Sequence, residues 1–168
     1  MTPARTRRWR GFIAAVSLLL ALATGGHAAP AGDVKPFDAS SLAAIRTVYA
    51  NHPFVLAFWS IHCAPCLEDM ADWRAFRQRY PGVPILLVNT DTSDDGKRVA
   101  AALARHRPGN VDKWAFADEF TERVRYSIDR SWRGELPRTY FYDSQHHVDV
   151  VSGRLDRTWT DAWFSRVR

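Results

Sequence analysis

Cysteine is scarce in this sequence, because Cys63 and Cys66 are the only two cysteines among 168 residues. With no third cysteine, neither sulfur can form a separate structural disulfide within the chain. A bridge between them would close a loop too short to restrain much of the unfolded chain, so a stabilising role is unexpected. The pair is therefore a redox couple, part of a metal site or an inert loop, and the C-x-x-C spacing favours the redox couple.

A second C-x-x-C is also missing from the sequence. A structural zinc site normally needs four ligands, which are often supplied by two such pairs. The acidic segment with Asp91, Asp94 and Asp95 lacks the glycine spacing and the well-placed glutamate of a calcium loop, so we interpret it as a solvated loop before a helix. We therefore predict no metal site.

Near the N-terminus, no apolar run reaches the roughly 20 residues that a membrane span needs. Residues 12–23 form a shorter apolar stretch, preceded by four arginines between positions 5 and 10 and followed by small residues at 24–29. Basic, then apolar, then small is the order of a secretory signal. We predict a signal peptide over residues 1–28, a mature domain over 29–168 and a periplasmic location, with an uncleaved membrane anchor as the alternative.

The predicted mature chain has almost no net charge. The whole sequence carries 23 basic and 18 acidic residues, a formal net charge of +5. Without the four arginines of the signal, 19 basic residues face the same 18 acidic ones. A nearly neutral chain lacks the basic face that phosphate binding requires, so we exclude nucleic acid as a partner.

Apolar periodicity predicts alternating strands and helices in one domain. The continuously apolar run at 54–59 is typical of a strand that is buried on both faces. Residues 30–38 are predicted to be an irregular lead-in. The further predicted strands are 83–89, 114–116, 138–143 and 148–152, and the predicted helices run over about 41–50, 64–80, 96–107, 120–128 and 158–167.

The dithiol falls where the first buried strand meets the next helix. Cys63 is predicted at the helix N-terminus, where free backbone N–H groups favour a thiolate, and Pro65 suits the first turn. Cys66 lies one turn further along and is expected to be less exposed. Cys63 is therefore the predicted nucleophile, Cys66 the predicted resolving sulfur, and exchange through a mixed disulfide the predicted reaction.

Two segments resemble the TlpA/ResA-like exported thiol-disulfide oxidoreductases of the thioredoxin superfamily. The core pattern F-W-A-x-W-C-x-P-C-x-x-E is matched by Phe58-Trp59-Ser60-Ile61-His62-Cys63-Ala64-Pro65-Cys66-Leu67-Glu68-Asp69. The family's cis-proline is matched by Leu136-Pro137-Arg138. The resemblance implies an α/β thioredoxin fold, with a central mixed β-sheet flanked by helices. It also implies a cis Pro137 that faces the dithiol and receives the substrate backbone, and a substrate groove that includes Trp59 and Leu136.

Three positions depart from a familiar pattern. Ala57 stands where thioredoxin has a buried aspartate, and the TlpA/ResA-like branch also lacks that aspartate. Asp69 stands where that branch usually has glutamate, and we expect Asp69 or Glu68 to assist proton transfer at Cys66; the alternative is a solvated acid in the first turn. His62 replaces the usual tryptophan, and it either favours the Cys63 thiolate as an imidazolium or is a surface residue.

The resemblance further implies a monomer that mostly reduces disulfides in exported proteins, for cytochrome c maturation or copper-site assembly. Electrons would come from a membrane thiol carrier of the DsbD/CcdA kind, and no cofactor beyond the two cysteines would be needed. One alternative is a Sco-like copper chaperone that uses His146 and His147. We place these histidines in a hairpin turn remote from the cysteines and interpret them as solvated. The other alternative is a noncatalytic binding module with the same fold.

Overall fold

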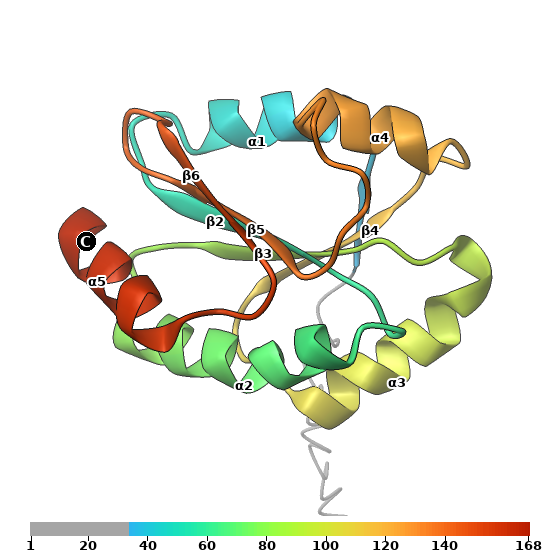
Figure 1. Ribbon diagram of the computed structural model, residues 1–168, viewed down its shortest axis with the longest axis horizontal. Coiled ribbons are helices and arrows are strands. Elements are labelled where there is room, and N and C mark those ends of the chain that lie inside the picture. The colour runs from blue at the N-terminus through green and yellow to red at the C-terminus, as the bar shows by residue number, and fades with distance from the viewer. Residues whose placement is uncertain (1–33) are drawn as a thin grey trace, which may run out of the picture. The chain divides into compact units, whose positions relative to one another are not determined.

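The computed structural model describes residues 34–168, so the predicted signal peptide lies outside the described residues. The described chain forms a six-stranded mixed sheet in the order β1-β4-β3-β2-β5-β6 (Figure 1). The first four of these are parallel, and β5 and β6 are antiparallel to their neighbours. The strands are β1 Lys35–Phe37, β2 Phe54–Trp59, β3 Ile85–Asn89, β4 Asp112–Phe116, β5 Arg138–Tyr142 and β6 Val148–Ser152.

Helices cover both faces of this sheet (Figure 1). On one face lie α1 (Ser41–Val48) and α4 (Thr121–Ile128), and on the other lie α2 (Ala64–Arg79), α3 (Gly96–His106) and α5 (Arg157–Val167). A short 3-10 turn, η1 (Ser93–Asp95), precedes α3. Among residues 34–168, no helix combines the length and the apolar character that crossing a membrane requires.

The burial of strand β2 on both faces explains why its sequence is apolar without alternation. All six of its residues are buried, because the two faces of the strand serve two separate cores. Val55, Ala57 and Trp59 pack with α2 and α5, whereas Phe54, Leu56 and Phe58 pack with α1 and α4. This packing fixes the position of β2, and the segment that follows it therefore starts from a fixed point at the carboxyl end of the strand.

The predicted irregular lead-in was wrong for Lys35–Phe37, which forms the parallel edge strand β1. Phe37 is fully buried, pairs with Phe116 of β4, and packs edge-on against Phe58. A three-residue strand with one buried side chain has no measurable periodicity, and its partner strand lies far along the sequence. The other strands and the helices lie where the sequence predicts them, within two residues at most ends.

Candidate functional site

Cys63 and Cys66 lie at the junction of β2 and α2, and they form a disulfide with an S–S distance of 2.05 Å. Cys63 is the N-cap of α2, and its Sγ accepts a hydrogen bond from the backbone N–H of Cys66 at 3.2 Å. Pro65 occupies the first turn, where its missing N–H leaves no intrahelical bond unmade. One N–H group of this helix end, that of Cys66, therefore points at the first sulfur, and the first sulfur lies at the helix N-terminus, as the sequence predicts.

The two sulfurs differ in exposure. Cys63 is half-buried, whereas Cys66 is only 2% exposed and belongs to the core cluster beneath α2. A protein or reagent that approaches from solvent therefore meets Cys63 first. This asymmetry is the geometry that an attacking and a resolving cysteine require.

Asp91 fixes the loop that precedes Cys63. Its two carboxylate oxygens accept hydrogen bonds from the Ser60 hydroxyl at 2.5 Å and from the Ile61 backbone N–H at 2.8 Å. The Asn89 side chain donates to the same carboxylate at 2.7 Å. Our interpretation of Asp91 as a residue of a solvated loop was wrong. The signal was its position two residues after the end of β3, which is the strand beside β2. The two strands are parallel, so the segments that follow them start at the same end of the sheet.

His62 is exposed, and its Nε2 lies 3.9 Å from a carboxylate oxygen of Asp95. Within residues 34–168, donor atoms of His62, Asp91 and Asp95 lie within 4.8 Å of one another. Two of these residues already have other partners, because Asp91 holds the Cys63 loop and Asp95 pairs with Arg98 at 2.7 Å. The observed arrangement thus pairs His62 with an acid beside the dithiol.

The Leu136–Pro137 peptide bond is cis, as the resemblance implies. Pro137 is buried at the start of β5, and its carbonyl accepts a hydrogen bond from Gly153 at 2.9 Å. Because Arg138 pairs with Phe58, Pro137 lies at the end of β2 from which the Cys63 loop departs. Leu136 is half-buried and packs on the same core cluster as Cys63.

Trp59 does not line a surface groove. It is 3% exposed and packs in the core with Cys66 and α2, so the prediction that it contacts substrate was wrong. The apolar residue that ends a doubly covered strand is drawn inside, because burying an aromatic side chain is more favourable than exposing it. Its ring supports the dithiol segment from beneath.

Asp69 is 2% exposed, so the alternative of a solvated acid was wrong for this residue. Burial raises the pKa of Asp69, and the opposing effect of Arg154, whose Nε lies 3.5 Å away, is weaker. Glu68 is exposed and forms an ion pair with the same arginine at 2.8 Å. Of the two candidate acids, only Asp69 shares the interior with Cys66.

The hairpin histidines lie far from the cysteines. The β5–β6 turn is at the opposite end of β5 from Pro137, because Tyr142 pairs with Phe54 at the start of β2. His147 is exposed, as interpreted, but His146 is not free in solvent: its Nε2 lies 2.9 Å from the Tyr49 carbonyl oxygen. Neither histidine shares a site with the dithiol, which removes the basis for the Sco-like alternative.

An ion-pair network beside Pro137 was not predicted. The Arg138 guanidinium lies 2.6 Å from Asp129, and the Tyr140 hydroxyl donates to the same carboxylate at 3.2 Å. Hydrogen bonds from Ser131, followed by the one from Arg138, hold the pKa of Asp129 at about 2. No motif marks this network, because an aspartate, a serine, an arginine and a tyrosine at these spacings form no recognised pattern.

No family model matches the sequence, and no curated protein matches it either. Solved structures do match. A secreted Mycobacterium tuberculosis disulfide oxidoreductase, described as homologous to E. coli DsbE, superposes with a TM-score of 0.59 and 15% identity, over 71% of this chain and 85% of that one. A thiol:disulfide interchange protein of the thioredoxin family from Chlorobium tepidum TLS gives 0.60 and 12%, over 73% and 83%. StoA from Bacillus subtilis gives 0.52 and 15%, over 67% and 82%. The chain therefore has the thioredoxin fold.

Proposed function

We propose that this protein is a thiol-disulfide oxidoreductase that acts on exported proteins through the Cys63–Cys66 pair. The observation that carries the proposal is the bonded pair at the N-terminus of α2, with one sulfur half-buried and the other buried. The matched structures support it, since one is named as a disulfide oxidoreductase and another as a thiol:disulfide interchange protein. The redox centre is the cysteine pair itself, so the proposal needs no cofactor.

In the reaction that we propose, the Cys63 thiolate attacks a substrate disulfide and forms a mixed disulfide. The helix N-terminus stabilises this thiolate, and a protonated His62 would add to that effect. Cys66 then loses its proton to Asp69 and attacks Cys63, which releases the reduced substrate. Pro137 and Leu136 border the place where the substrate backbone would lie.

The finer parts of the proposal follow the family resemblance. The protein would act as a monomer in the periplasm, after removal of the signal over residues 1–28. It would reduce disulfides for cytochrome c maturation or copper-site assembly and would receive electrons from a membrane carrier of the DsbD/CcdA kind. A redox titration of the dithiol tests the direction, because a couple much more oxidising than its compartment cannot act as a reductant.

Insulin reduction tests the activity itself. The wild-type protein should catalyse it, Cys63→Ser should be inactive, and Cys66→Ser should accumulate mixed disulfides with substrates. The matched control is Ser144→Ala, an exposed position in the β5–β6 hairpin at the opposite end of the sheet, which should reduce insulin at the wild-type rate. Absence of turnover together with absence of a trapped partner would instead support the noncatalytic binding module.

The role of His62 is tested by the pKa of the Cys63 thiol in wild type and in His62→Ala. A higher pKa in the variant supports an electrostatic role for the imidazolium. An unchanged value makes His62 a surface residue with no part in the chemistry.

A further inference from the structure

Asp72 is a buried acid that the proposed mechanism does not use. It lies three residues after Asp69 on α2 and is 4% exposed. One of its oxygens, Oδ1, lies 2.6 Å from the Arg157 guanidinium, but Oδ2 is buried without any hydrogen-bond partner among the described residues. A buried polar atom without a partner costs free energy, so its retention calls for an explanation such as a catalytic role or a bound water.

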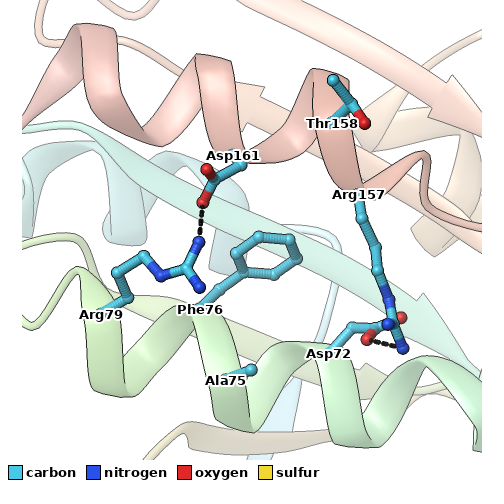
Figure 2. Close-up of a pocket in the computed structure, with 7 residues that line it drawn as sticks. All are labelled: Asp72, Ala75, Phe76, Arg79, Arg157, Thr158 and Asp161. Carbon is cyan, nitrogen blue, oxygen red and sulfur yellow. Dashed lines mark hydrogen bonds and ion pairs between the residues drawn. The ribbon is translucent and has the colours of Figure 1, made fainter.

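The surroundings of Asp72 give it access to water. It lines a cavity of about 360 Å³ between α2 and α5 (Figure 2), with Ala75, Phe76, Arg79, Arg157, Thr158 and Asp161. The side chains of Arg79 and Arg157 are 64% and 72% exposed, so the cavity opens to solvent. Its volume exceeds the roughly 30 Å³ that one water molecule occupies in the liquid.

Within residues 34–168, Asp69 is more enclosed than Asp72. It is 2% exposed, and Arg154 lies over it with one nitrogen near Asp69 and another on Glu68. A guanidinium cannot accept a proton, so this arginine offers no route outward. Asp72 is the next acid along the same side of α2, because residues three apart on a helix are neighbours.

We propose that Asp72 passes to the cavity water the proton that Asp69 takes from Cys66, an inference that rests on the proposed function. The Cys66 thiol gives its proton to Asp69, and the resulting thiolate attacks the Cys63 sulfur. The bond between Cys63 and the substrate sulfur breaks, and its electron pair leaves with the substrate. The proton leaves Asp69 through Asp72 to water as the Cys66 thiolate forms, so that slow release of this proton slows the attack. The substrate thiolate takes up a proton from water.

The charges around Asp72 belong to both packed elements. Arg157 forms an ion pair with Asp72, and Arg79 and Asp161, which also line the cavity, form a second ion pair at 2.7 Å. The groups that a pH profile has to account for are Asp69 and Arg79 on α2, Arg154 before α5, and Arg157 and Asp161 on α5.

The test observes the two chemical steps separately. Reduced protein is mixed with excess 5,5′-dithiobis(2-nitrobenzoate), whose first coloured thiolate reports attack by Cys63 and whose second reports attack by Cys66. In Asp72→Asn, the second step should slow about tenfold at neutral pH, less than the about 100-fold typical of losing a direct base. The first step should keep its wild-type rate, and added imidazole should restore the second by carrying protons through the cavity.

Asp161→Asn is the matched control, because it lines the same cavity, is more exposed and lies off the route from Cys66. Arg157→Met provides a second measurement that does not depend on the folding of Asp72→Asn. A carboxylate that loses a neighbouring cation holds its proton more tightly, so the pH profile of the second step should move upward. Wild-type second-step rates and pH profiles in both variants would overturn the proposal. A wild-type protein that shows neither step would instead overturn the proposed function.

Discussion

Asp129 anchors the start of β5 beside Pro137, and replacing it by asparagine tests whether this network stabilises the fold. The carboxylate accepts hydrogen bonds from the Ser131 hydroxyl and backbone, from Arg138 at 2.6 Å and from Tyr140 at 3.2 Å. Asp129→Asn keeps the shape of the side chain and removes the charge. We expect the variant to fold with a lower free energy of unfolding.

The magnitude follows from the pKa of Asp129, which lies at about 2 against an ordinary value of 3.8. At about 1.4 kcal/mol per pH unit, this difference is worth about 2.5 kcal/mol. The side chain is 21% exposed, so solvent screening reduces the expected loss to about 1–2 kcal/mol at neutral pH. Because the folded state holds the charged form more strongly, this stability is present above pH 3.8 and is lost as the pH falls toward 2.

The assay is chemical unfolding of wild type and Asp129→Asn at several pH values between 2 and 7. The stability gap should be largest at neutral pH and should close toward pH 2. Asp149→Asn is the control, because Asp149 is 52% exposed, makes only a surface ion pair with Arg166, and should change stability by less than about 0.5 kcal/mol. A gap of equal size at pH 2.5 and pH 7 would refute the electrostatic reasoning and leave only a packing effect.

Three further changes give separate checks. Phe141→Ala should lower the free energy of unfolding by about 3–5 kcal/mol, since this fully buried ring packs against Trp163 with 5.1 Å between the ring centroids. Calorimetry and denaturant titration measure the loss, and a loss below about 1 kcal/mol would contradict this packing. Asp91→Ala should lower the free energy of unfolding by about 1–3 kcal/mol and change the alkylation rate of reduced Cys63, because it leaves the Ile61 N–H unpaired. Asp91→Asn retains an acceptor oxygen and should lose less stability. Burial raises the pKa of Asp69, so the wild-type protein loses stability as the pH rises above 3.8, and the stability of Asp69→Asn relative to wild type should increase from pH 4 to pH 8. A constant difference would show that burial does not penalise the charge.

The fold was predictable from sequence because its central strands are buried on both faces. Continuous apolar runs at β2 and β3 and helical spacing in α2 identify these elements without any partner. Strand β1 could not be predicted, because Lys35–Phe37 becomes a strand only by pairing with residues of β4 that lie 79 positions further on. Contacts between segments so distant in sequence leave no local pattern.

The dithiol was predictable for a different reason, since C-x-x-C spacing and the strand–helix junction are both local. Its supporting residues were not. Asp91 and Asp72 act through contacts with Ile61 and Arg157, which lie 30 and 85 residues away, and their side chains look like ordinary surface acids in the sequence. Only tertiary contacts distinguish these two aspartates from solvated ones: Asp72 is buried, and Asp91 accepts hydrogen bonds from the loop before Cys63.

The hairpin turn between β5 and β6 lies at the end of the sheet opposite to the two cysteines. Ser144 and Gln145 at its tip are exposed, whereas neighbouring His146 is held against Tyr49 and Phe54. A fluorophore or a surface tether attached at Ser144 or Gln145 would thus report on the protein, or immobilise it, while the end of the sheet that carries Cys63 stays open to solvent.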